Sequence, residues 1–248
     1  MTDLPEYLKQ GERARLFPVL ADTSRENRIA SIFLSLLPQM PPLAGAVLNT
    51  VGLRVGKRTK IEAYTEIVLK EGNEKGNRPD GLLVVSTGKN TWSALVEAKI
   101  GKSKLDPDQV QRYLELARAN GIDAVITISN QFVAKADHSP VVVSKTLLRK
   151  TGLFHWSWTW LATQCEILAL QGTIEDQEQT FLLKEFLRFL KHSGTGVERF
   201  SQMGPRWKDL VQSVTNNGTL KKTAPEVEEG VGELAPFSTG HLGLNQEA

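Results

Sequence analysis

Apolar residues recur along the chain in distinct patterns, and each pattern predicts a type of element. Helical spacing of three to four residues predicts helices over residues 24–37, 106–120 and 178–192. Residues 59–69 alternate between apolar and polar positions, which predicts a half-buried strand. Short apolar runs rich in β-branched or aromatic residues predict further strands at 81–86, 92–100, 124–129 and 155–161.

The order of these elements predicts an α/β fold. A helix comes first, three strands separated by turn-forming stretches follow, and a helix and a buried strand come next. Strands that meet at short turns pair as hairpins, and the helices must then bury their apolar sides on the faces of the sheet. We therefore expect a central mixed sheet flanked by helices, with the last amphipathic helix as a C-terminal helical extension.

The two ends of the chain differ from its middle. Residues 1–21 have a mixed composition, which predicts an irregular or short helical lead-in. A proline cluster at positions 38–42 is expected to end the first helix. Residues 22–217 are expected to form the α/β domain, and the Glu- and Gly-rich residues 218–248 a flexible acidic tail.

Composition narrows the chemistry that the chain can carry. Its 248 residues include one cysteine, Cys165, and four histidines that do not lie at ligand spacing. A disulfide framework and a cysteine-rich zinc site are therefore excluded, and oxygen ligands point to Mg²⁺ or Mn²⁺ as any catalytic metal. Neither a signal-like segment nor an apolar run long enough to cross a bilayer is present, so we expect a soluble cytoplasmic protein without a membrane partner.

Three charged residues converge if the predicted strands pair. Asp80 begins the strand after Pro79, and Glu97 and Lys99 lie near the end of the next strand. Residues two apart on a strand share a face, so Glu97 and Lys99 point the same way, and a hairpin brings Asp80 close to Glu97. Two neighbouring buried carboxylates repel each other, and a divalent cation relieves that repulsion.

This arrangement resembles the PD-(D/E)XK nuclease superfamily. The pattern reads Pro79-Asp80, a 16-residue gap, and then Glu97-Ala98-Lys99, in an element order similar to the restriction-endonuclease-like αβββαβ core. The resemblance implies that Asp80, Glu97 and the Ala98 backbone carbonyl bind Mg²⁺, for which Mn²⁺ can substitute. It implies that Lys99 assists catalysis, and that the protein hydrolyses phosphodiester bonds in nucleic acid, with DNA as the expected substrate.

Two further features extend the resemblance over residues 25–129. Gln109 and Tyr113 lie one helical turn apart, and this QxxxY spacing is similar to that of RecB-type and lambda-exonuclease-type members. There the pair lies close to the active site and can touch nucleic acid. Relatives often add an acidic residue before the strands, and Glu26 is the candidate, with Glu66 as the alternative.

Each of these features also has a structural explanation. Glu97 and Lys99 can form an internal salt bridge, and Glu26 can complete a capping box with Thr23. Tyr113 can pack against the sheet while Gln109 is exposed. The tryptophans at 156, 158 and 160 fit a core better than a base-stacking platform.

The main functional alternative is a catalytically inactive nuclease-fold protein that binds nucleic acid or a protein partner. The apolar surplus of the helix at 178–192 could also bury a homodimer interface or an accessory protein. Neither a phosphate-binding loop of the form GxxxxGK[ST] nor a GxSxG elbow is present, which argues against an NTPase and an α/β hydrolase.

Overall fold

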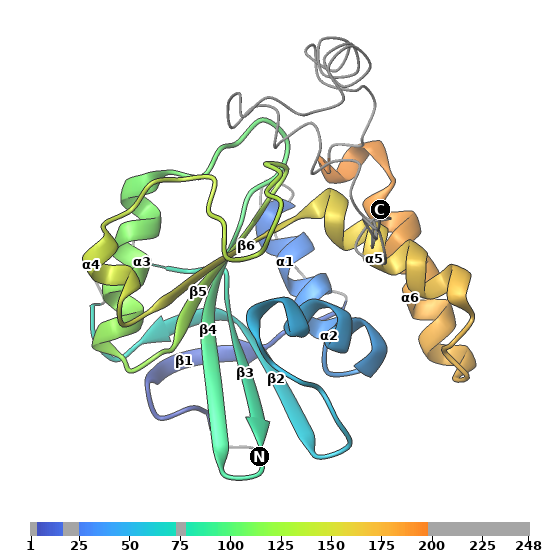
Figure 1. The fold of residues 1–248 in the computed structure, drawn as a ribbon, viewed down its shortest axis with the longest axis horizontal. Helices are drawn as coiled ribbons and strands as arrows, with labels where there is room; N and C mark the ends of the chain where they lie inside the picture. The colour runs from blue at the N-terminus through green and yellow to red at the C-terminus, as the bar shows by residue number, and fades with distance from the viewer. Residues whose placement is uncertain (1–3, 17–24, 73–77, 198–248) are drawn as a thin grey trace, which may run out of the picture.

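A mixed sheet forms the centre of the protein. The computed structural model describes residues 4–16, 25–72 and 78–197. Within them, six strands form one sheet whose spatial order follows the order along the chain (Figure 1). Neighbouring strands pair antiparallel from β1 to β4 and parallel from β4 to β6. The strands are β1 (Leu8–Arg13), β2 (Thr59–Leu69), β3 (Gly81–Thr87), β4 (Asn90–Ala98), β5 (Ala124–Ser129) and β6 (Gly152–Ser157).

Helices lie on both sides of the sheet, which confirms the predicted α/β class (Figure 1). The connections between the parallel strands contain α3 (Pro107–Ala119) and α4 (Lys145–Leu148), which lie on one face. The opposite face carries α1 (Arg25–Leu36), α2 (Pro41–Leu48), α5 (Trp158–Gln171) and α6 (Gln177–Leu190), with α6 packed against α5. Two short 3-10 turns complete the described elements, η1 (Asn49–Val51) and η2 (Ser193–Thr195).

The central strands are buried on both faces, which explains their continuous apolar sequences. Leu83 and Val96 belong to the apolar layer beneath α1, α2 and α5, whereas Leu82 and Leu95 belong to the layer beneath α3. A strand covered on both sides has no solvent-facing positions, so polar residues are not needed at alternate sites. A charged residue on such a strand is then an exception that requires a partner.

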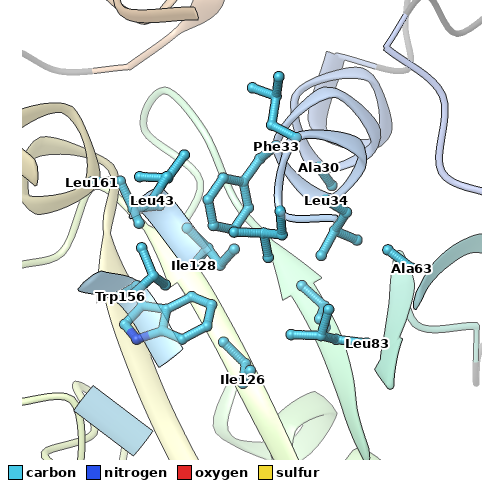
Figure 2. Packing of buried hydrophobic residues seen from close by; sticks show 14 of the residues in the cluster. Ala30, Phe33, Leu34, Leu43, Ala63, Leu83, Ile126, Ile128, Trp156 and Leu161 are labelled. Carbon is cyan, nitrogen blue, oxygen red and sulfur yellow. The ribbon is translucent and has the colours of Figure 1, made fainter. Parts of the chain in front are cut away.

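Phe33 of α1 lies at the centre of the larger layer. Its ring contacts Trp156 and Trp158 edge-on and stacks on Phe186, with all three centroid distances at 6.1 Å. Figure 2 shows Phe33 projecting from α1 toward Ile128 and Trp156 of the sheet. These contacts fix the position of α1 on the sheet, and therefore also the position of Glu26 in its first turn.

Most of the predicted elements are confirmed, some to the residue. The strands predicted at 59–69 and 124–129 are β2 and β5 with the same bounds, and those at 81–86 and 92–100 are close to β3 and β4. The three predicted helices are α1, α3 and α6. Asp106 caps α3 as its sequence predicts, because its carboxylate accepts a 3.0 Å hydrogen bond from Asp108 N.

The expectations for the N-terminal part were wrong in two places. Residues 8–13 form β1, which pairs with β2, although an irregular or helical lead-in was predicted. The proline cluster does follow α1, but Pro41 and Pro42 also open α2, a helix that was not predicted. Proline is tolerated in a first helical turn, where its missing N–H has no helical partner to lose.

The strand predicted at 155–161 was also wrong in its second half. β6 ends at Ser157, whose side chain accepts a 3.0 Å hydrogen bond from Trp160 N and so caps α5. The three tryptophans therefore do not share one face of a strand. Trp156 and Trp158 are fully buried core residues, whereas Trp160 is only half-buried.

Some expectations concern residues outside the described ranges. Thr23, the partner in the expected capping box, and the tail predicted at 218–248 both lie there. Among the described residues, no single helix is long and apolar enough to cross a membrane. Only α1 and the segment Pro41–Val51 meet that test when they are taken together, and the pair is bent by 109°.

Candidate active site

The acidic residues named from the sequence meet at one end of the central strands β3 and β4. β3 and β4 pair in a register that matches Gly81 with Val96, so the next residue of each strand places Asp80 opposite Glu97. Gly81 lets the start of β3 lie close to α1 and β2. A Cβ at Gly81 would lie 2.5 Å from Leu34 Cδ1 and 3.0 Å from the Tyr64 carbonyl oxygen. A larger residue would therefore displace the start of β3 and Asp80 with it.

Asp80 is tied directly to the neighbouring strand. Its Oδ2 accepts a 2.7 Å hydrogen bond from the backbone N–H of Ala98. Burial raises the pKa of Asp80, the negative charge of Glu97 raises it further, and the Ala98 N–H and Lys99 oppose the change. In the absence of a cation, the fold therefore disfavours two ionised carboxylates at this place.

Glu97 is the most buried charged side chain of the site, with 2% of its side chain exposed. Its Oε1 accepts a 2.5 Å hydrogen bond from Lys99 Nζ, while Oε2 is buried with no hydrogen-bond partner among the described residues. Burial raises the pKa of Glu97 and Lys99 opposes the change. A buried carboxylate oxygen without a partner is costly, and a bound cation or water would relieve that cost.

Lys99 connects two carboxylates, those of Glu97 and Glu26. Its Nζ lies 2.5 Å from Glu97 Oε1 and 3.6 Å from Glu26 Oε2. Burial alone would lower the pKa of Lys99, but Glu97, Glu26 and Asp80 outweigh it, and the pKa is raised. Lys99 is therefore a permanent cation at neutral pH.

Glu26, and not Glu66, is the additional acidic residue at this end of β3 and β4. The first turn of α1 brings Glu26 Oε1 within 3.3 Å of the backbone N–H of Ile100, which donates to it. Glu66 is exposed on β2 with a backbone φ of 52°, next to an irregularity in the pairing with β1. It is not one of the carboxylates around Lys99.

Gln109 and Tyr113 share a face of α3 as predicted, and that face covers the acidic residues. Gln109 Nε2 donates a 3.1 Å hydrogen bond to the Tyr113 hydroxyl, which donates one of 3.1 Å to the Arg78 carbonyl oxygen. Burial and the charge of Glu97 raise the pKa of Tyr113, so the hydroxyl remains protonated. The pair thus holds the segment that leads into Asp80.

The loop that joins Lys99 to α3 is held by residues that the sequence did not point out. Asn130 Nδ2 donates to the carbonyl oxygen of Gly101, and the side chain of Gln131 accepts from Leu105 N at 3.1 Å. Asn130 Nδ2 and Gly101 N also donate to the carbonyl oxygen of Gly196, which ties the loop to a distant part of the chain.

A buried histidine fixes this arrangement from the edge strand. His155 Nε2 lies 2.7 Å from the Gln131 carbonyl oxygen, which can only accept, so Nε2 carries the proton. Its Nδ1 then accepts from the Thr127 hydroxyl at 2.9 Å. Thr127 pairs in register with both Glu97 and His155, so a polar row crosses the three parallel strands. Burial lowers the pKa of His155 to about 4, so it is neutral at pH 7.

The donor chemistry of the site fits a Mg²⁺-class ion. Among the described side chains, groups of three or more His, Cys, Asp and Glu arranged to hold a metal are absent. However, Asp80 and Glu97 supply only oxygen donors, one of which is buried and unpartnered, and a divalent cation would offset their repulsion. The roles of the Ala98 carbonyl as a ligand, and of Gln109 and Tyr113 as nucleic-acid contacts, stay predictions.

No protein-family model matches the chain, and comparison with curated proteins gives no significant match. Its function therefore has to be inferred from the chemistry of the site.

Proposed function

We propose that the protein is a metal-dependent nuclease that hydrolyses phosphodiester bonds, with DNA as the expected substrate and the cytoplasm as the expected location. The observation that carries this proposal is the position of Asp80 opposite Glu97 at the end of β3 and β4. Lys99 is hydrogen-bonded to one Glu97 oxygen, and the other oxygen has no partner among the described residues.

Each residue of the site has a role that follows from its surroundings. Asp80 and Glu97, with the Ala98 carbonyl, would hold Mg²⁺ or Mn²⁺, which acidifies a bound water and neutralises charge on the phosphate. Lys99 stays protonated, so it acts as a cation that stabilises the negative charge developing on the phosphate and not as a base. Glu26 helps to hold the Lys99 ammonium at the end of β4.

The topology supports the resemblance to the PD-(D/E)XK superfamily. The described elements run α1, β2, β3, β4, α3 and β5, which parallels the αβββαβ core except that α2 is inserted after the first helix. The pairing of Asp80 with Glu97 and the Gln109–Tyr113 pair on α3 support the proposal of a RecB-like variant.

Exposed cations around the site support a polyanionic substrate. Lys102 and Lys104 lie in the loop after Lys99, and Arg78 and Arg112 flank Asp80 and Tyr113. All four side chains are exposed, and none forms an ion pair with a described carboxylate. Cations in this position can neutralise the phosphates on either side of the bond that is cut.

The test is cleavage by the purified full-length protein. Labelled single- and double-stranded DNA and RNA would be incubated with Mg²⁺, with Mn²⁺ and with EDTA. We expect divalent-cation-dependent cleavage that Asp80→Asn and Glu97→Gln abolish, and that Glu66→Gln, the matched carboxylate outside the site, leaves unchanged.

A different result is expected if the protein is a catalytically inactive nuclease-fold protein. Cation-independent binding of nucleic acid without cleavage of any substrate would overturn the catalytic proposal and favour a binding protein. Calorimetric titration with Mn²⁺ separates the two, because the active site should bind the ion in the wild type and lose it in Glu97→Gln.

A further inference from the structure

A second concave site lies on the β6 edge of the sheet, away from Asp80 and Glu97. It is a cavity of about 520 Å³ bounded by four segments of the chain, which are residues 50–52, 133–137 and 154–157 and the first turn of α5. Its volume falls within the range of small-molecule sites. Asp80, Glu97 and Lys99 do not line it.

Hydrogen bonds fix the walls of this cavity. On one side, His155 N donates to the Ala136 carbonyl oxygen at 2.7 Å, which holds the loop against β6. On the other side, the buried Trp156 donates from Nε1 to Thr50 Oγ1 at 3.0 Å, which holds η1 against β6. A preformed cavity loses less conformational freedom when it takes up a ligand than a surface that must first be ordered.

Two aromatic side chains remain accessible on these walls. Trp160 and Phe154 are half-buried and line the cavity, in contrast to the fully buried Trp156 and Trp158. The backbone of Trp160 is fixed by its hydrogen bond to Ser157 Oγ at the helix cap. An indole with part of its surface free can serve as a stacking platform for a planar ring.

The charged lining offers one cation and one anion. Lys135 and Asp137 lie on the loop wall and are exposed, and Lys135 forms no ion pair with a described carboxylate. The first turn of α5 also borders the cavity, and the positive end of a helix dipole favours negative charge. Asp137 can accept hydrogen bonds from ring amino groups or sugar hydroxyls.

We propose that this cavity is a nucleotide-binding site. The base stacks on Trp160, the phosphate pairs with Lys135, and Asp137 accepts from the base or the ribose. The site is separate from the Asp80–Glu97 centre and does not require that centre to be active.

Binding of nucleoside 5′-monophosphates tests this proposal. AMP, GMP, CMP and UMP would be titrated calorimetrically into the full-length protein in EDTA, which removes binding through a divalent cation at Asp80 and Glu97. We expect at least one to bind, with roughly tenfold weaker binding in Trp160→Leu and near-wild-type binding in Trp160→Phe, because base stacking needs an aromatic face. Lys135→Ala should weaken binding of the nucleotide but not of the matching nucleoside.

Controls separate this site from the proposed nuclease centre. Glu97→Gln should bind nucleotide like the wild type, and so should Lys89→Ala, whose exposed lysine lies in the turn between β3 and β4. Circular dichroism would establish that each variant is folded. Failure of all four nucleotides to bind, wild-type affinity in Trp160→Leu, or loss of binding in Glu97→Gln would each overturn the proposal, whatever the outcome of the cleavage assays.

Discussion

Removing the hydroxyl of Tyr113 should destabilise the protein and disturb the position of Asp80. The hydroxyl makes two hydrogen bonds of 3.1 Å, one received from Gln109 Nε2 and one donated to the Arg78 carbonyl oxygen. Tyr113→Phe keeps the ring of a residue that is 1% exposed, and removes these bonds together with the interaction of the hydroxyl with the Glu97 carboxylate. The variant therefore isolates the polar contribution of the residue.

The expected cost follows from those two bonds. A buried hydrogen bond contributes about 1 kcal/mol net, so the loss of two lowers the free energy of unfolding by about 2 kcal/mol. For a chain of this size, that lowers the melting temperature by about 4–8 °C. Gln109→Met removes one of the two bonds and keeps the length of the side chain, so it should cost about half as much.

Urea denaturation followed by far-UV circular dichroism measures both variants. Equal midpoints for Tyr113→Phe and the wild type would refute the inference that the hydroxyl holds the segment before Asp80. If the site cleaves nucleic acid, kcat should also fall in Tyr113→Phe, because Asp80 is intact but less well positioned.

Three further outcomes are expected. In cation-free buffer, stability should fall as pH rises above about 4, because Asp80 and Glu97 have raised pKa values in the folded state and retain protons that the unfolded chain releases. In thermal melts, Mg²⁺ should reverse this loss of stability, and Asp80→Asn should make stability depend less on pH. If stability depended on pH in Asp80→Asn as it does in the wild type, the assignment of the effect to Asp80 would be wrong. Phe33→Ala should lower the free energy of unfolding by about 3–5 kcal/mol in urea denaturation. Phe181→Ala, at a residue that is 64% exposed, should lower it little. Equal losses in the two variants would contradict the core described for α1. If the site binds and cleaves DNA as proposed, Gln131→Ala should weaken DNA binding in fluorescence anisotropy and raise KM more than it lowers kcat, because it frees one end of the loop before α3. An unchanged KM would argue against that role.

The predictable parts of the fold are those in which local pattern and packing agree. The alternation over β2 and the β-branched run of β5 gave both strands their observed bounds. β6 was extended too far because alternate tryptophans continue the strand pattern beyond Ser157, where a side-chain cap starts a helix. α2 was missed because Pro41 and Pro42 are helix breakers in most contexts, and only their place in a first turn makes them compatible with a helix.

The candidate site also has parts that follow from local patterns and parts that depend on tertiary packing. The opposition of Asp80 and Glu97 follows from strand register, and the shared face of Gln109 and Tyr113 follows from helical spacing. The choice of Glu26 over Glu66 depends on how α1 packs over the sheet, which no local pattern contains.

Residues that act through the backbone were not predictable from their identity. Asn130, Gln131 and His155 have no distinctive spacing, and their bonds connect carbonyl and N–H groups of distant loops. The one available signal was that Asn130 and Gln131 follow a buried parallel strand, since ligands in α/β sheets often bind outside the carboxyl ends of the strands.

The contact between Gly196 and the loop after Lys99 bears on when the site can form during synthesis. Gly101 N and Asn130 Nδ2 both donate to the Gly196 carbonyl oxygen, and the Trp158 indole donates to the carbonyl oxygen of Lys99. A nascent chain that already contains Asp80 and Glu97 therefore lacks the Trp158 contact until 61 further residues have been made, and the Gly196 contacts until 99 have been made. A truncated chain that ends before Gly196 should therefore keep the contacts among the acidic residues and Lys99 but lack the bonds that hold the loop after Lys99.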